Sequence, residues 1–167
     1  MKKLSGTMAA ILAAAILTGA FVATSGYAAP KEKANDGRFI AYNNQTVLDT
    51  KTNLMWAAKD NGSNISWDDA KSYCENYRGG GYTDWRMPTS DELADLYNSG
   101  KSRPAACKTG YSIHAATELI DITCFALWTS ETHGSDAAVF GFGRGYKMWM
   151  RQSLAILSRA MPVRSVK

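Results

Sequence analysis

Residues 65–93, ISWDDAKSYCENYRGGGYTDWRMPTSDEL, contain the two clearest helix signals in the chain. The first helix is expected to begin after Ser66, a good N-cap residue, and to end at the three glycines 79–81. Its apolar side chains recur at helical spacing, at Trp67, Ala70, Cys74 and Tyr77. The second helix is expected to begin after Thr89, because Thr89 and Glu92 form the T-x-x-E pattern of a capping box. Between the helices, we expect Trp85 to be buried.

Short strand patterns lie on both sides of the helices. They cover 39–42, 46–48 and 54–57 before them, and 126–130, 138–142, 146–151 and 158–163 after them. Residues 98–124 show no firm periodicity, and a connection of that length inside a compact domain tends to be functional. The order of strands, two helices, a long loop and further strands predicts an α+β domain.

The first 28 residues have the pattern of a secretory signal peptide. Two lysines precede an apolar run at 8–22, which is shorter than the ~20 residues of a membrane-spanning helix. Gly26-Tyr27-Ala28 provides a small-x-small cleavage site, so we expect cleavage after Ala28. The alternative is an uncleaved N-terminal anchor. We expect export to the periplasm or the cell exterior, with no stable membrane span after cleavage.

Cleavage would leave a flexible N-terminus at 29–37 and a single domain at 38–167. It would remove two lysines and no acid, so the net charge of +4 would fall to about +2, which argues against a nucleic-acid partner. The charge is unevenly distributed, because residues 137–167 contain no Asp or Glu. Their cations are Arg144, Lys147, Arg151, Arg159, Arg164 and Lys167. This segment can attract anions, or its charges can simply solvate the outer faces of strands.

The three cysteines are expected to be oxidised in part, because an exported protein meets an oxidising compartment. Cys107 and Cys124 flank a polar, weakly periodic stretch, and a disulfide closing this loop of roughly 18 residues would stabilise the fold by about 3 kcal/mol. Cys74 lies on the apolar side of the first helix and is expected to be a buried thiol. An alternative zinc site would use Cys107 and Cys124 with His114 and His133. Their spacing lacks any close pair of ligands, which disfavours a metal.

Several stretches of the chain resemble the Lcl C-terminal domain family, a domain of unknown function in exported bacterial proteins. The matching stretches are TVLDTKTNLMWA (46–57), ISWDDAKSYCENYRGGGYTDWRMPTSDEL (65–93), LWTSET (127–132), AVFGFGRG (138–145) and RAMPVR (159–164). The resemblance implies a C-type-lectin-like fold related to the formylglycine-generating enzymes, with a small mixed or antiparallel sheet and with the first and last strands side by side. Many family members carry a cysteine in the last strand, which is absent here, and residues 98–124 match no family pattern.

The strand 146–151 provides the candidate ligand surface. Alternation places Tyr146, Met148 and Met150 on one face and Lys147, Trp149 and Arg151 on the other. If the methionines face the core, the indole lies outside between two cations. Such a surface can stack on a sugar ring and pair with its sulfate or carboxylate groups. The candidate ligand-binding residues, including the cation in the adjoining turn, are Arg144, Tyr146, Lys147, Trp149 and Arg151. The alternatives are a buried Trp149 or a face that is only solvated.

These features favour an exported, non-enzymatic binding module that recognises an anionic glycan or a protein partner at the cell envelope. We expect no catalytic residues and no cofactor. One alternative is an enzyme related to the formylglycine-generating oxidases. The resemblance gives those enzymes a copper-binding cysteine pair in their C-terminal part, whereas no cysteine follows Cys124 here. A second alternative is a structural subunit of an envelope assembly.

Overall fold

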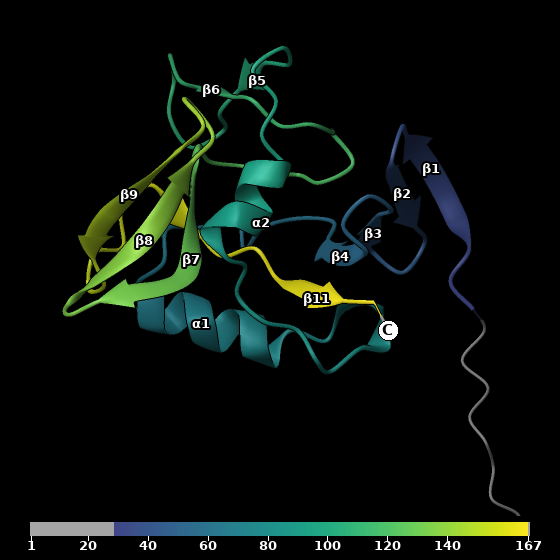
Figure 1. The fold of residues 1–167 in the computed structure, drawn as a ribbon, viewed down its shortest axis with the longest axis horizontal. Coiled ribbons are helices and arrows are strands. Elements are labelled where there is room, and N and C mark those ends of the chain that lie inside the picture. The colour runs from purple at the N-terminus through teal and green to yellow at the C-terminus, as the bar shows by residue number, and fades with distance from the viewer. Residues whose placement is uncertain (1–28, 167) are drawn as a thin grey trace, which may run out of the picture.

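The computed structural model describes residues 29–166, which form two sheets, a short hairpin and two helices (Figure 1). The predicted signal peptide, residues 1–28, lies outside the described residues. Most strand pairs are antiparallel, so the predicted α+β class is confirmed. Within residues 29–166, no helix has the length and apolar character needed to cross a membrane.

The first sheet has five strands in the order β1-β2-β3-β4-β11, and all neighbouring strands are antiparallel. Its strands are β1 (Glu32–Asp36), β2 (Phe39–Tyr42), β3 (Thr46–Asp49), β4 (Leu54–Ala57) and β11 (Val163–Ser165). The predicted strands at 46–48 and 54–57 form the β3–β4 hairpin. All four residues of β4 are buried, and the strand has a partner on each side.

The second sheet has four strands in the order β10-β7-β8-β9. Its strands are β7 (Ala126–His133), β8 (Asp136–Gly141), β9 (Tyr146–Arg151) and β10 (Ser158–Arg159). Only the β10–β7 pair in this sheet is parallel. The predicted long loop contains a small hairpin of its own, formed by β5 (Arg103–Pro104) and β6 (Ser112–Ile113).

Both predicted helices are present with the expected caps. Helix α1 (Trp67–Asn76) begins after Ser66, whose side chain accepts a hydrogen bond from the amide of Asp69, and a short 3₁₀ helix (Gly79–Gly81) follows it. Helix α2 (Ser90–Asp95) begins with the complete capping box of Thr89 and Glu92. Trp85 is buried between them, and its indole Nε1 donates to the carbonyl of Gly79 at 3.1 Å.

Two apolar clusters hold these layers together. Helix α1 packs on one face of the four-stranded sheet, where Ala70 and Cys74 meet Trp128 and Val139. The other cluster joins the five-stranded sheet, α2 and the segment between α2 and β7, called the loop region below. It includes Trp56, Leu93, Ile122 and Phe142. The second sheet is therefore covered by α1 on one face and partly by α2 on the other.

Three expectations about the chain ends need correction. Residues 32–36 of the predicted flexible N-terminus form β1. This strand is polar and pairs through its main chain, so it leaves no apolar pattern in the sequence. The predicted strand at 158–163 is divided between β10 and β11, which belong to different sheets. The last strand pairs with β4, whereas β1 lies at the opposite edge, so the first and last strands are not side by side.

Candidate ligand-binding groove

The tight turn between β8 and β9 forms one side of the groove. Gly145 has a φ of +70°, and a Cβ atom at this position would lie 2.5 Å from the ring of Tyr97. Only glycine combines this backbone conformation with such a close approach. The turn therefore packs directly on Tyr97 and holds the exposed Arg144 at the tip of the hairpin.

The hairpin of β5 and β6 approaches this turn from the loop region and forms the other side. The amide of His114, directly after β6, donates to the carbonyl of Phe142 at 2.9 Å. The predicted disulfide between Cys107 and Cys124 is present, with a Cα–Cα distance of 5.2 Å. It braces the segment that carries Tyr111 and Phe125. Because both sulfurs are bonded to each other, they cannot act as thiolate ligands in the alternative zinc site.

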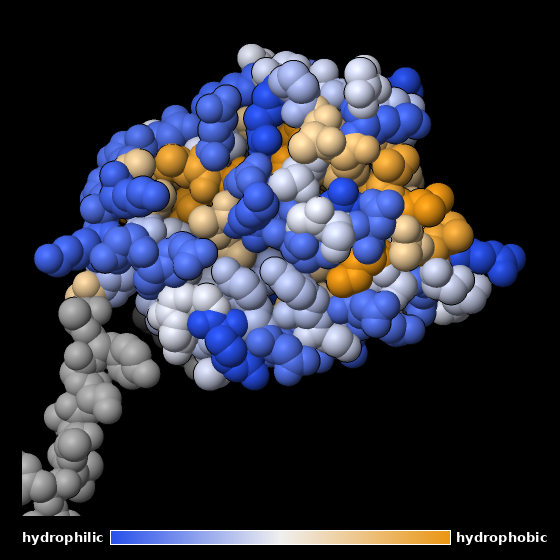
Figure 2. All heavy atoms as spheres, turned by 180° about the vertical axis from the view of Figure 1, so that it is seen from behind, coloured by the Kyte–Doolittle hydropathy of each residue, from blue (hydrophilic) through white to orange (hydrophobic). Residues whose placement is uncertain are grey.

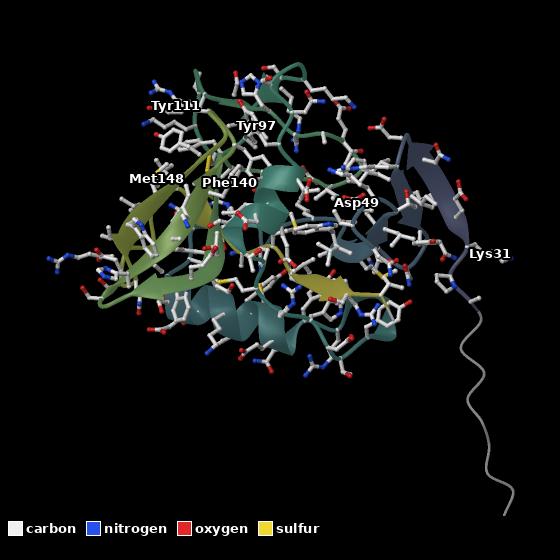
Figure 3. The ribbon with its side chains drawn as sticks, in the orientation of Figure 1. Lys31, Asp49, Tyr97, Tyr111, Phe140 and Met148 are labelled. Atoms are coloured by element: carbon white, nitrogen blue, oxygen red, sulfur yellow. A yellow bond between two sulfur atoms is a disulfide. The ribbon has the colours of Figure 1, made fainter. Side chains whose placement is uncertain are left out.

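Between these two walls lies a groove of about 610 Å³. Its lining residues are Gly110, Tyr111, Ser112, Phe125, Gly141, Gly143, Arg144, Tyr146 and Met148. Figure 3 shows Tyr111 of the loop region above Met148 of β9, at the end of the four-stranded sheet. Tyr111 stacks on Phe125 with ring centroids 4.7 Å apart and planes 18° apart. Tyr111 and Tyr146 remain 43% and 47% exposed, so both rings are available to a ligand.

The groove is lined by cationic and neutral side chains. Arg144 borders it, and Lys108 Nζ lies 4.5 Å from the ring centroid of Tyr111 and 3.3 Å from its hydroxyl oxygen. No Asp or Glu is among the lining residues. Among residues 29–166, neither Arg144 nor Lys108 has a salt-bridge partner within 4.0 Å. Both charges are therefore available to an anion in the groove.

Gly141 keeps the floor of the groove open. It lies opposite Tyr146 in the β8–β9 ladder. A Cβ atom at Gly141 would be 3.2 Å from the terminal methyl of Met148, so a side chain here would occupy the space beside Met148. Gly143 brings the main chain close to Ser112, and its Cβ would lie 3.5 Å from the Ser112 carbonyl oxygen. The distance at Gly143 is an ordinary contact, so the open floor of the groove depends on Gly141.

The structure divides the five predicted ligand-binding residues between two faces of the sheet. Arg144 and Tyr146 border the groove. Lys147, Trp149 and Arg151 lie on the opposite face and are exposed. Trp149 is 48% exposed, which excludes the alternative of a buried indole, and Lys147 Nζ lies 5.6 Å from its ring centroid. Tyr146 is a predicted ligand-binding residue that alternation places on the face of the methionines. It does share the face of Met148, but it lies at the tip of the hairpin, where it borders the groove and stays exposed.

The residues that sequence reasoning missed come from the loop region. Tyr111 and Phe125 line the groove, and Lys108 lies beside Tyr111. Their segment has no periodic pattern and matches no stretch of the resemblance. Tyr111 lies between two cysteines that form a disulfide. Aromatic residues inside a disulfide-closed loop are the signal that could have directed attention to this wall.

Two cations of the acid-free C-terminal segment have internal roles. Arg164 Nε lies 2.6 Å from Asp84 Oδ1, and its guanidinium carbon lies 4.1 Å from the ring centroid of Tyr82. Arg159 is buried and donates to Asn64 Oδ1. Burial lowers the pKa of the Arg159 guanidinium, while the nearby Asp60 carboxylate opposes that effect. These two cations are thus part of the folded core.

Cys74 is a buried free thiol, as predicted. Burial raises its pKa to about 12, and the Glu75 carboxylate adds to the effect. A thiol in this environment is protonated at neutral pH and is a poor nucleophile or metal ligand.

These features define the chain as a small α+β domain with two sheets and a disulfide-braced groove at one end of the second sheet. A match to the family model of the Lcl C-terminal domain spans residues 45–166. The chain therefore belongs to the Lcl C-terminal domain family, and the predicted resemblance is confirmed. None of the curated proteins compared with the chain matches it.

Proposed function

We propose that this protein is an exported, non-enzymatic binding module that recognises anionic glycans in the groove at the tip of the β8–β9 hairpin. The observation that carries this proposal is the arrangement of Tyr111, Tyr146 and Arg144. Two partly exposed aromatic rings border a groove that has a cation beside it and no acidic lining residue.

This arrangement fits the chemistry of a sulfated or carboxylated sugar. The apolar face of a sugar ring can pack on a tyrosine ring. The planar guanidinium of Arg144 can donate two hydrogen bonds to one sulfate or carboxylate group. Lys108 adds a second positive charge next to Tyr111. A neutral sugar would use only the rings and would bind more weakly.

Export is supported by two independent features. The first 28 residues have the pattern of a signal peptide, and disulfides such as Cys107–Cys124 persist mainly outside the reducing cytosol. A binding module in the periplasm or outside the cell would meet envelope or host polysaccharides.

The alternative of an oxidase related to the formylglycine-generating enzymes has less support. Its chemistry would require a reactive cysteine pair. Here Cys107 and Cys124 form a disulfide, and the remaining Cys74 is buried with a raised pKa. A structural subunit of an envelope assembly is the other alternative, and it predicts no selective affinity for anionic sugars.

The proposal is tested by calorimetric titration of the purified protein with a heparin octasaccharide. Arg144→Ala should weaken binding about tenfold or more, because a charge-assisted hydrogen bond contributes about 1.5–3 kcal/mol. Tyr111→Ala should also weaken binding, because it removes the ring on which the sugar packs. Lys33→Ala removes an exposed cation in β1, far from the groove in sequence and in a different sheet, and should change affinity less than about twofold. The affinity should fall steeply as salt concentration rises.

Equal affinities for all three variants would overturn the proposal. The double variant Lys147→Glu plus Arg151→Glu tests the opposite face of the sheet, where sequence analysis placed part of the ligand surface. If this variant loses binding while the groove variants keep it, the glycan lies on Trp149 and the groove assignment is wrong.

A further inference from the structure

Strand β9 is an open edge of the four-stranded sheet. The described residues place no strand beyond it, and it runs along the outer margin of the molecule (Figure 1). Two other sheet edges, those of β11 and β10, are covered. Val163 of β11 exchanges two main-chain hydrogen bonds with Arg86, at 2.9 and 3.0 Å. Next to β10, Ala160 accepts a hydrogen bond from the amide of Asn61 at 3.0 Å.

The hydrogen-bond alternation defines which main-chain groups β9 leaves open. The amide of Gln152, directly after β9, donates to the carbonyl of Ser135, directly before β8. The amide of Phe142, directly after β8, donates to the carbonyl of Phe125, directly before β7. In an antiparallel ladder, residues bond to the same neighbour at every second position. Met148 and Met150 therefore bond to β8, whereas the main chains of the intervening residues face away from it. The outward-facing residues are Lys147, Trp149 and Arg151.

Both the open main-chain groups and the exposed side chains thus belong to the same three residues. Their free main-chain groups are the amides of all three and the carbonyls of Lys147 and Trp149, because the carbonyl of Arg151 accepts from the amide of Leu154 at 3.0 Å. A strand that pairs with β9 would place every second side chain directly beside Lys147, Trp149 or Arg151.

We propose that the open edge of β9 binds an extended acidic peptide segment of a partner protein as an additional antiparallel strand. The partner strand presents acidic side chains opposite Lys147 and Arg151 and an aromatic or apolar side chain opposite Trp149. Its intervening side chains lie on the face of Met148 and Met150 and are apolar. The recognised pattern is acidic-apolar-aromatic-apolar-acidic.

Charge complementarity selects this occupant over a second copy of the chain. If β9 paired with itself in the fully overlapped antiparallel register, Lys147 would lie opposite Arg151 at both ends of the strand. Like charges directly opposite each other destabilise a strand pair, and cations on an edge strand oppose association between identical edges. An acidic strand converts both contacts into attractive pairs. Among residues 29–166, neither cation has a salt-bridge partner within 4.0 Å.

This interaction is independent of the proposed glycan site. The groove lies at the tip of the hairpin, between the β8–β9 turn and the loop region, whereas the partner's acidic and aromatic side chains meet Lys147, Trp149 and Arg151 on the other face. Only its intervening apolar side chains share the face of Met148. Arg144→Ala and Tyr111→Ala should therefore leave peptide binding within about twofold of wild type. Heparin binding tests the glycan site and peptide binding tests the edge of β9, so one proposal can fail while the other holds.

Two peptides of identical composition test the pattern. The first, acetyl-Ser-Glu-Val-Tyr-Val-Glu-Ser-amide, places both acids on the same face as the tyrosine. The second, acetyl-Ser-Val-Glu-Tyr-Glu-Val-Ser-amide, moves the acids to the other face. Titration of each peptide into ¹⁵N-labelled protein should show at least tenfold weaker binding of the second. Equal affinities, or no binding of either peptide, would overturn the proposal.

Amide exchange tests the main-chain pairing directly. On addition of the first peptide, the amides of Lys147, Trp149 and Arg151 should become protected from exchange, whereas those of Met148 and Met150 should already be protected without it. Protection of the three outward amides in the free protein at high concentration, with a matching shift to a dimer, would instead identify a second copy as the occupant and overturn the proposal.

A pair of variants at one position separates main-chain from side-chain binding. Trp149→Ala removes the indole, and Trp149→Pro removes the indole together with the outward amide while leaving the β8 hydrogen bonds intact. Trp149→Ala should weaken binding of the first peptide a few-fold. Trp149→Pro should weaken it at least tenfold more than Trp149→Ala does. Equal affinity of the two variants would contradict strand addition. The exchange experiment on the wild type stands even if the proline variant does not fold.

Discussion

The two sheets use their charged and aromatic side chains differently. On the five-stranded sheet, Arg164 is paired with Asp84, and Arg38 Nε lies 3.1 Å from the buried carboxylate of Asp49. On the four-stranded sheet, the cations at the tip and edge are exposed and, within the described range 29–166, have no acidic partner within 4.0 Å. Arg38 and Arg164 thus stabilise the fold on the first sheet, whereas Arg144, Lys147 and Arg151 at the tip and outer strand of the second sheet are available to ligands. Arg159 of β10 is a buried exception.

The apolar side chains show the same division. Within residues 29–166, the exposed large apolar side chains are Tyr111, Tyr146, Trp149, Leu154 and Ile156. All of them belong to the loop region, to β9 or to the segment after it. Seen from behind, apolar surface is present on the side of the four-stranded sheet, and a further apolar patch lies toward the opposite side (Figure 2). Folding alone does not require aromatic rings to face water, so this half is the better candidate for binding.

The largest expected contrast in stability is between two tryptophans of the second sheet. Trp128 is completely buried, and its Nε1 donates to the carbonyl of Ile65 at 2.8 Å, whereas Trp149 is exposed. Trp128→Ala should lower the free energy of unfolding by about 3–5 kcal/mol, and Trp149→Ala by less than about 1 kcal/mol. Urea denaturation measures both. Similar losses for the two variants would show that Trp149 is part of the core.

The disulfide should have the next largest effect. Replacing Cys107 and Cys124 together by serine should lower the free energy of unfolding by about 3 kcal/mol, because the unfolded chain regains the freedom of the closed loop. The same variant should lose heparin affinity, since one wall of the groove is no longer braced. Wild type in reductant is the matched control and should behave like the variant. Unchanged stability in both would contradict a structural role for the bridge.

Replacing an internal cation should lower the free energy of unfolding more than replacing an external one, and this difference should be smaller than the effect of the disulfide. Arg164→Ala should cost about 2 kcal/mol, because it removes two hydrogen bonds to Asp84, at 2.6 and 3.1 Å, and the contact with Tyr82. Arg151→Ala should change the free energy of unfolding by less than about 0.5 kcal/mol. Chemical denaturation of the pair at the same pH and salt concentration makes the comparison. A loss of 2 kcal/mol for Arg151→Ala would place that cation among the structural ones.

The smallest expected effect depends on pH. Burial by itself would raise the pKa of Glu92, but hydrogen bonds from Arg86 and Thr89 outweigh it and lower the pKa below the usual 4.5. A lowered folded-state pKa stabilises the protein above pH 4.5, and this contribution disappears as the pH falls through the folded-state value. Glu92→Gln should therefore cost about 0.5–1 kcal/mol at pH 7.

Because glutamine still fits a capping box, this variant isolates the charge of Glu92. The stability difference between Glu92→Gln and wild type should shrink as the pH falls below 4.5, and thermal unfolding across that range measures it. A difference that stays constant with pH would mean that the Glu92 charge does not contribute to the difference.

Local chemistry made much of the fold predictable from the sequence. The helix starts at Ser66 and Thr89 depend on hydrogen bonds within one turn, and the disulfide depends on two cysteines flanking one loop. Alternation in β9 divided its residues correctly between two faces, although it left open whether Trp149 or the methionines face outward. Each of these features is determined over a few residues or by one residue type.

The features that were not predicted depend on contacts between distant segments. Strand β1 is polar and forms through main-chain pairing with β2, so no side-chain pattern marks it. The pairing of β11 with β4 joins residues more than a hundred positions apart. The groove needs Tyr111 from the loop region beside Tyr146 from β9, and nothing local to either residue indicates that the other is near.

The most direct test of this division between the halves is a chemical-shift map of the ¹⁵N-labelled protein titrated with heparin octasaccharide. We expect the largest shifts at residues 108–112 and 141–146, and almost none in β1 to β4. Shifts concentrated in the five-stranded sheet, or spread evenly over all exposed lysines and arginines, would contradict a binding site at the tip of the β8–β9 hairpin.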